Sequence, residues 1–259
     1  MIRFNLLGSL EIRHDNVDCT PSPPKVRSVL ALLLLRANQT VSQDAIFDWL
    51  WGNYPPRSAA TTTQTYVYQL RALFERVGIK DCAERLLITR STGYLLVLGP
   101  DQLDASIFAR LVNEGSALLD SGRPAEAAQR LHDALALWRG PVLEDVNVEN
   151  RLAADIAHLS ELRVRALELR IEAASRLGRH RELITELRAL VAAYPFNEWF
   201  HAQLISALNR CGRRVEALQA YRTLRQTLSE ELGLEPTPEM QELQRQVLDG
   251  SSVRLAVAA

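Results

Sequence analysis

Residues 55–74 read "PPRSAATTTQTYVYQLRALF", and the two halves of this stretch favour different structures. In the second half, Leu70, Leu73 and Phe74 recur at the spacing of an amphipathic helix. The residues before them include four threonines, at 61, 62, 63 and 65, whose β-branched side chains lose rotamer freedom in a helix. Because the two leading prolines cannot lie inside a helix, we expect a helix over about residues 58–77 that begins with residues of low propensity.

This helix is predicted to have one buried and one outward face. With about 100° of rotation per residue, one side holds the residues expected to pack on other helices: Thr63, Tyr66, Val67, Leu70, Leu73, Phe74 and Val77. The opposite side, called the outward face below, has hydroxyls and amides: Thr61, Gln64, Thr65 and Tyr68, with Gln69 and Arg71 at its margins. Burial of the first side would stabilise the helix without help from intrinsic propensity. Alternatively, Thr61 and Gln64 form a capping box that starts the helix at Thr61.

The flanking sequence completes a winged helix-turn-helix pattern. Alternating apolar residues over 2–19 predict short antiparallel strands around an Asp15-Asn16 turn. The stretch "KVRSVLALLLLRA" at 25–37 predicts a buried helix, and "VSQDAIFDWLWG" at 41–52 predicts a second helix with a serine cap and a terminal glycine. "LLITRSTGYLLVL" at 86–98 predicts a hairpin that turns at Ser-Thr-Gly. Strands, three helices and a hairpin within about a hundred residues predict this domain type.

The outward face fits a helix that enters the major groove of DNA. Hydroxyl and amide groups hydrogen-bond base edges or phosphates, and a helix N-terminus favours an anion. Arginines beside the helix would approach phosphates, and the hairpin tip would follow the backbone or enter the minor groove. The residues predicted to contact DNA are Lys25, Arg27, Arg57, Thr61, Thr62, Gln64, Thr65, Tyr68, Gln69, Arg71, Arg90, Ser91 and Thr92. The alternative is that the threonines and the two cations of the first helix are merely solvated.

Charge is unevenly distributed along the 259 residues, a length that favours two domains. Residues 1–99 have 11 Lys and Arg against 8 Asp and Glu, a net charge of +3. The remainder has 19 against 23, a net charge of −4. A basic surplus in the N-terminal part is expected if that part meets a polyanion.

The sequence holds no recognisable catalytic, nucleotide-binding or metal-binding motif. Its three cysteines are far apart and lack C-x-x-C spacing, its five histidines form no H-E-x-x-H pair, and neither a phosphate loop nor a G-x-S-x-G elbow occurs. The longest apolar run, "VLALLLL" at 29–35, is far shorter than the roughly 20 residues that span a bilayer. We therefore expect a cytoplasmic protein that is not an enzyme, with no cofactor and no membrane association.

From Leu103 to Leu248 the sequence predicts helices, with a Gly-Arg pair that recurs three times. Each Gly of these pairs is followed by Glu four residues later and by a large residue nine later: Gly122, Glu126 and Leu131; Gly178, Glu182 and Leu187; Gly212, Glu216 and Tyr221. The second and third glycines are 34 residues apart, the period of a tetratricopeptide repeat. The first and second are 56 apart, which indicates an insertion around "WRGPVLEDVNVEN". We predict an all-α tetratricopeptide-like repeat domain whose concave surface suits a protein partner, with a bundle of coincidentally similar turns as the alternative.

Taken in order, these motifs resemble the Streptomyces antibiotic regulatory protein family. The resemblance rests on "KVRSVLALLLLRANQTVS", "LWGNYPPRSA", "YVYQLRALF", "TGYLL", "LWRGPVLEDV" and "RCGRRVEALQAYRTLRQTLSEELGLEPTPEMQELQRQVL". Members of this family have an OmpR-like winged-helix domain followed by a tetratricopeptide-like bacterial transcriptional activation domain. The resemblance therefore implies a winged-helix domain over 1–99, an activation domain over 100–250 and a tail over 251–259.

The resemblance also implies partners and a role. It implies a transcription activator, for a secondary-metabolite (antibiotic) gene cluster, that pairs side by side on direct repeats in promoter DNA. It implies recruitment of the RNA polymerase holoenzyme, including its sigma factor, with candidate contacts at Gly52, Asn53, Tyr54 and Arg57. Relatives often have a basic residue where this chain has Thr61–Thr63, so the resemblance extends to the class of protein but not to the operator sequence. Larger relatives append an ATPase and sensor module, so this chain resembles the small form or an excised piece.

A second hypothesis comes from a different class of protein. The chain would then be a helical-repeat adaptor whose winged domain binds protein rather than DNA. That hypothesis predicts that the outward face can be altered without loss of activity.

Overall fold

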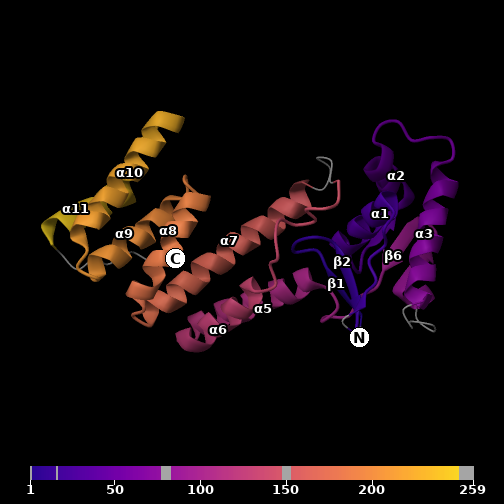
Figure 1. Cartoon of the computed structure of the whole chain (residues 1–259), viewed down its shortest axis with the longest axis horizontal. Coiled ribbons are helices and arrows are strands. Elements are labelled where there is room, and N and C mark those ends of the chain that lie inside the picture. The colour runs from indigo at the N-terminus through magenta and orange to yellow at the C-terminus, as the bar shows by residue number, and fades with distance from the viewer. Residues whose placement is uncertain (1, 16, 77–82, 148–152, 251–259) are drawn as a thin grey trace. The chain divides into compact units, whose positions relative to one another are not determined.

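The structure is a computed structural model, and it describes residues 2–15, 17–76, 83–147 and 153–250 (Figure 1). Its contacts divide the chain into two compact units. Unit 1 comprises Met1–Glu114 and Arg130–Ala166, and unit 2 comprises Gly115–Gln129 and Leu167–Ala259. Within the described part of the chain, no helix is both long and apolar enough to cross a membrane.

Unit 1 begins with an antiparallel sheet in the order β1-β2-β3. Its strands are β1 (Ile2–Asn5), β2 (Glu11–His14) and β3 (Val17–Asp18). Alternation along the strands buries Phe4 and Ile12 completely, which confirms the predicted strands. Asp15, at the predicted turn, has a φ of 48°, whereas Asn16 lies outside the described residues.

Three helices follow this sheet: α1 (Pro24–Leu35), α2 (Gln43–Trp51) and α3 (Ala59–Arg76). The helix α1 is buried along most of its length, as its apolar sequence predicted, and packs on α2 and α3. The Ser42 hydroxyl caps α2 by accepting a hydrogen bond from the Ala45 amide at 3.1 Å. Gly52 ends α2 with a φ of 66°. Both predicted ends of the second helix are therefore confirmed.

A second sheet, in the order β4-β6-β5, completes the winged part of unit 1. Its strands are β4 (Thr40–Ser42), β5 (Leu87–Arg90) and β6 (Gly93–Leu96), and the short helix α4 (Ala83–Leu86) precedes β5. The hairpin formed by β5 and β6 turns at Ser91 and Thr92, as predicted. The strand β4 was not predicted, because three residues are too few to show an alternating pattern.

The segment between two later helices packs on the first sheet of unit 1. The helices in this region are α5 (Asp104–Asp120), α6 (Pro124–Leu135) and α7 (Ala153–Arg176). The described part of the predicted insertion lies between α6 and α7, where the Arg139 amide donates to the Leu7 carbonyl at 2.8 Å and the Leu143 amide to the Leu6 carbonyl at 3.1 Å. The described part of the insertion therefore packs against the chain between β1 and β2.

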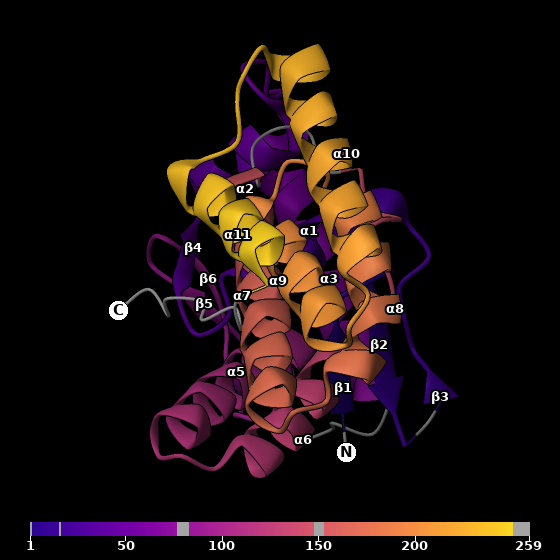
Figure 2. The same ribbon diagram turned by 90° about the vertical axis from the view of Figure 1, so that its left-hand side faces the viewer.

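In unit 2, the helix α9 packs on three neighbours (Figure 2). The helices are α8 (His180–Ala193), α9 (Glu198–Arg210), α10 (Arg214–Leu232) and α11 (Pro238–Asp249). The glycines of the three Gly-Arg pairs have φ values of 74°, 74° and 75°, and the amide of each following arginine bonds a carbonyl five residues back. This is the Schellman ending of a helix, so each Gly-Arg pair ends one helix and opens the turn to the next. The predicted tail, 251–259, lies outside the described residues.

Candidate nucleic-acid interface

The helix α3 begins two residues before Thr61. The Ala59 amide bonds the Pro56 carbonyl at 2.9 Å, and the Thr62 amide bonds the Ser58 carbonyl at 2.9 Å. These bonds start the helix within one residue of the prediction, and the capping box that would have started it at Thr61 is not the start. Further along, the Thr65 hydroxyl donates to the Thr61 carbonyl at 3.0 Å.

The burial pattern of α3 confirms the two predicted faces. The buried side includes Thr63, Val67, Leu70 and Phe74, with Tyr66 and Leu73 partly buried and Val77 outside the described residues. Thr61, Gln64, Thr65, Tyr68 and Gln69 are exposed, and Thr62 is partly buried. Tyr68 is 71% exposed to solvent, which is unusually high for an aromatic residue. The outward face is therefore available to a partner along the first three turns of the helix.

The second half of α3 is fixed by the core of unit 1. Phe74 is fully buried and meets the ring of Phe4 edge-on, with 6.0 Å between the ring centroids. Edge-on aromatic pairs of this kind add to the stabilisation from burial alone. Packing of the second half therefore stabilises the whole helix, including the first half with its threonines of low helix propensity.

The wing lies beside α3 and is bonded to it. Arg90, Ser91 and Thr92 are exposed at the hairpin tip, as a wing requires. Arg71 was expected to approach a phosphate, but its guanidinium bonds the Leu87 carbonyl and the Thr89 hydroxyl of β5. Thr89 was missed by the sequence reasoning. Its alternation with Arg90 could have placed it on one side of the hairpin, but no sequence pattern pairs it with α3.

The two cations of α1 have partners within unit 1. The Lys25 ammonium donates to the Leu50 carbonyl at 2.9 Å, although the residue remains exposed. The Arg27 guanidinium pairs with Asp145 and reaches the Leu10 carbonyl at 3.5 Å. The phosphate contact predicted for Arg27 stays a prediction, and in this structure its guanidinium bonds the 139–145 segment through Asp145.

The loop between α2 and α3 is exposed. Asn53, Tyr54 and Arg57 are all accessible, and Tyr54 is 88% exposed. Gly52 is partly buried at the end of α2. An aromatic side chain so fully in water is available for a protein contact.

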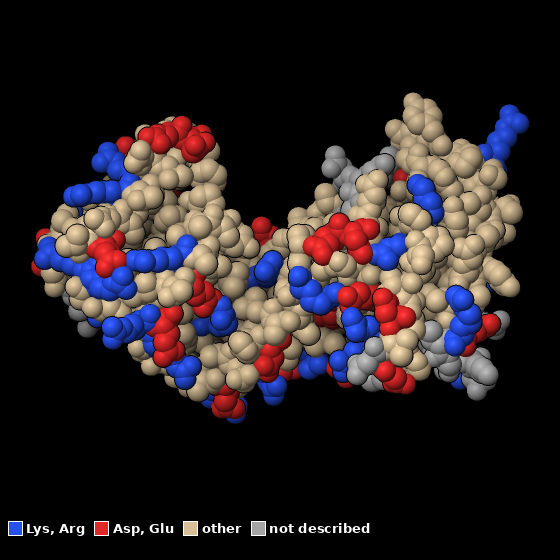
Figure 3. Space-filling view, viewed as in Figure 1, with Lys and Arg blue, Asp and Glu red and all other residues tan. Residues whose placement is uncertain are grey.

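On the face shown in Figure 3, the surface over α2 and α3 is mostly uncharged, with isolated basic groups and few acidic ones. The outward face of α3 therefore offers hydroxyls, amides and one phenol rather than a dense cationic stripe. Such groups suit base edges and phosphate oxygens at short range.

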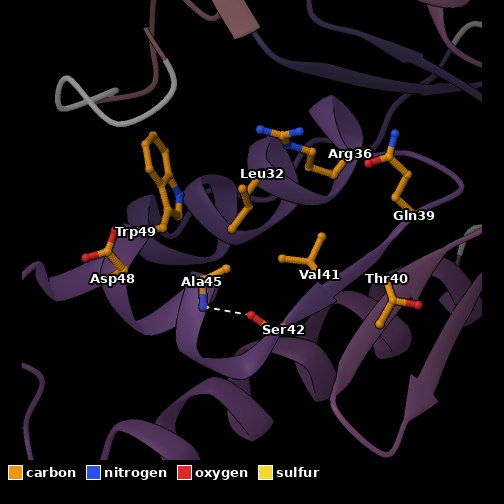
Figure 4. Close-up of a pocket in the computed structure, with 9 residues that line it drawn as sticks. All are labelled: Leu32, Arg36, Gln39, Thr40, Val41, Ser42, Ala45, Asp48 and Trp49. Carbon is orange, nitrogen blue, oxygen red and sulfur yellow. Dashed lines mark hydrogen bonds between the residues drawn. The ribbon is translucent and has the colours of Figure 1, made fainter. Parts of the chain in front are cut away.

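A hollow of about 360 Å³ lies on α1, β4 and α2 (Figure 4). It is lined by Leu32, Arg36, Gln39, Thr40, Val41, Ser42, Ala45, Asp48 and Trp49. Its Arg36 is paired with Asp155 at 3.0 Å, and it shares no residue with the outward face or the wing tip. In the part of the chain that the structure describes, no three His, Cys, Asp or Glu side chains are grouped to hold a metal.

Two family models match the chain. The model described as "Transcriptional regulatory protein, C terminal" matches residues 18–96, and the "Bacterial transcriptional activator domain" matches residues 103–248. The regulatory protein DnrI of Streptomyces peucetius is 41% identical over 250 residues, which are 95% of this chain and 92% of DnrI. The transcriptional regulator RedD of Streptomyces coelicolor is 34% identical over 91% of this chain and 67% of RedD.

A solved structure has the same fold. It is Mycobacterium tuberculosis EmbR in complex with a low-affinity phosphopeptide. The EmbR chain superimposes on this chain with a TM-score of 0.92, and the two are 33% identical in sequence. The match covers 98% of this chain and 66% of that one. The architecture of a small winged domain followed by a helical domain is thereby shown, and these relatives are transcription regulators rather than enzymes.

Proposed function

The chain belongs to the Streptomyces antibiotic regulatory protein family of transcription regulators, and we propose that it activates transcription by binding promoter DNA through α3 and the wing. The first half of α3 enters the major groove, while the wing tip contacts the adjacent backbone or minor groove. In this proposal, residues 1–99 bind DNA and residues 100–250 serve activation.

The observation that carries this proposal is the exposure of the outward face of α3 next to an exposed wing tip. The DNA-contacting residues that we propose are Arg57, Thr61, Thr62, Gln64, Thr65, Tyr68, Gln69, Arg90, Ser91 and Thr92. Glu75, near the end of α3, is also exposed and would be repelled by phosphate. Only the first half of the helix is therefore inserted.

Recruitment of RNA polymerase is assigned to the loop between α2 and α3. Gly52, Asn53, Tyr54 and Arg57 form the proposed contact, with Tyr54 as its apolar anchor. Tyrosine and arginine are enriched among residues that dominate the energy of protein interfaces. The same loop precedes α3 directly, so a polymerase contact and DNA binding would share one short stretch of the chain.

We further propose that two copies bind side by side on direct repeats at promoters of an antibiotic gene cluster, which places the action of the protein in the cytoplasm. The relatives named above are regulators of transcription, and this does not favour the adaptor hypothesis. A footprint on the promoter would give the operator, the repeat spacing and the stoichiometry together.

Substitution on the outward face provides the main test. Gln64→Ala and Tyr68→Ala remove a side chain that contacts bases in this proposal, and each is expected to weaken specific binding by about 5- to 100-fold. Binding to promoter fragments should be measured over a range of salt concentrations, because phosphate contacts make affinity fall steeply with salt.

The matched control is Gln219→Ala, which removes an exposed glutamine from α10 in unit 2. It should leave affinity and sequence preference unchanged. Unchanged affinity and preference in both Gln64→Ala and Tyr68→Ala would contradict the proposed face. Binding of a protein partner but no DNA would instead support the adaptor.

A further inference from the structure

The strand β5 lies at an edge of its sheet, where one row of backbone groups lacks a strand partner. In the order β4-β6-β5, β6 is the one strand among the described residues that pairs with it. Leu87, at the start of β5, is fully buried. A buried carbonyl without a donor is costly, so something other than a strand must satisfy this one.

Arg71 supplies that donor from α3. Its Nε and Nη2 donate to the Leu87 carbonyl at 3.1 and 2.7 Å, and Nη2 also donates to the Thr89 hydroxyl at 2.8 Å. The planar guanidinium thus reaches two acceptors on the same strand. Lysine has one point charge and cannot reproduce this fork. We call this set of bonds the helix–wing contact.

The helix–wing contact joins the two parts of the proposed DNA surface. Arg71 lies one helical turn after Tyr68 on the margin of the outward face. Thr89 directly precedes Arg90 at the wing tip. The bonded residues are 16 and 18 positions apart in sequence, so the contact joins the hairpin to the helix directly.

We infer that Arg71 is a positioning residue, which holds the wing at the distance from α3 that simultaneous contact with DNA requires. This inference rests on the proposed function. A two-point phosphate contact through Nε and Nη2 would have to displace the bonds to β5, because these donors are already directed at Leu87 and Thr89. A single phosphate contact through Nη1 would not displace them, and Arg71→Lys distinguishes that contact from positioning because lysine keeps the charge.

The test separates charge from geometry with Arg71→Lys and Arg71→Ala. A positioning role predicts that both variants weaken promoter binding by a similar factor of about ten, since lysine keeps the charge but not the fork. It also predicts faster hydrogen exchange of the backbone amides of β5 and β6 in the free protein. The matched control is Arg76→Ala, which removes a positive charge from the last turn of the same helix.

A double-mutant cycle with Arg90→Ala measures the coupling free energy between the two residues in DNA binding, which loss of charge alone would not change. If Arg71 acts through the wing, Arg90→Ala should cost less affinity in the Arg71→Ala background than in the unmodified chain. Thr89→Val is a milder variant at an exposed position, and it should shift hairpin exchange in the same direction by a smaller amount.

A phosphate contact predicts a different pattern. Arg71→Lys would bind nearly as well as the unmodified chain, Arg71→Ala would reduce the salt slope by about one, and its effect would add to that of Arg90→Ala. Those results, or unchanged hairpin exchange in Arg71→Lys, would overturn the inference. Lack of DNA binding by the unmodified chain would overturn the proposed function, and hairpin exchange would still report on the helix–wing contact.

Discussion

Thr63 is buried on the core side of α3 and only 1% exposed, and its hydroxyl has no hydrogen-bond partner among the described residues. A buried hydroxyl without a partner loses its hydration and gains no bond in return. Thr63→Val keeps the shape and should raise the free energy of unfolding by about 1 kcal/mol. Urea denaturation measures this, with Thr62→Val as the control on the same turn. A clear loss of stability in Thr63→Val would mean that the hydroxyl is bonded.

At the scale of single residues, the sequence predicted which side chains of α3 are exposed, but it did not predict the hydrogen-bond and ion-pair partners of the arginines. The rotation of 100° per residue is local, so it correctly divided Thr61, Gln64 and Tyr68 from Thr63 and Val67. The partners of Arg27 and Arg71 depend on the tertiary fold. Asp145 is 118 residues from Arg27, and no periodicity connects the two. Charged residues beside a predicted DNA surface can therefore form bonds within the protein that stabilise its fold.

At the scale of elements, the join between β4 and β6 depends on Gly93. A Cβ atom at this position would lie 1.9 Å from the Val41 carbonyl oxygen, closer than any real contact. Gly93→Ala is therefore expected to separate the two strands and to cost more than about 3 kcal/mol of stability. Thermal unfolding would show a large fall in the melting temperature. Gly99→Ala is the control, because its nearest neighbour is 3.4 Å away and belongs to a flexible side chain.

The elements that the sequence predicted are those with strong local signals. Capping residues, the prolines before α3 and the three Gly-Arg pairs all act within a few residues of where they lie. The strand β4 and the short helix α4 have three and four residues, too few to show a period, and β4 forms only because β6 pairs with it. The sequence thus predicted a winged-helix domain, but it did not predict the pairing of β4 with β6 that completes the second sheet.

At the scale of the whole chain, the family models meet near residue 100, but the contacts of unit 1 extend past that point. The Asp104 carboxylate accepts the Leu6 and Leu7 amides, each at 2.9 Å. The Phe4 amide bonds the Gln102 carbonyl at 2.7 Å. Burial raises the pKa of Asp104, and the amide bonds oppose that shift. The first sheet of the winged part is therefore bonded to the segment where the match to the activator-domain model begins.

A chain cut after residue 99 would leave these amides without acceptors. Each buried donor that loses its partner costs about 1–3 kcal/mol, a large share of the 5–15 kcal/mol that stabilises a typical domain. The cut also uncovers the apolar surface beneath Val142 and Leu143, both buried in unit 1. We therefore expect a fragment of residues 1–99 to be largely unfolded and one of residues 1–147 to be folded, as measured by circular dichroism and amide dispersion in NMR spectra.

In the full chain, Asp104→Ala tests the same contacts without a cut, and it should lower the stability of unit 1 by about 3 kcal/mol. Asp101→Ala is the matched control, because its carboxylate is largely exposed and pairs only at the surface with Arg110. If fragment 1–99 were as stable as fragment 1–147, the winged part would be independent and the Asp104 contacts energetically minor. If it is not, a ligand that displaces Gln102, Asp104 or the 139–145 segment would also act on the sheet that packs on α3, the helix proposed to bind DNA.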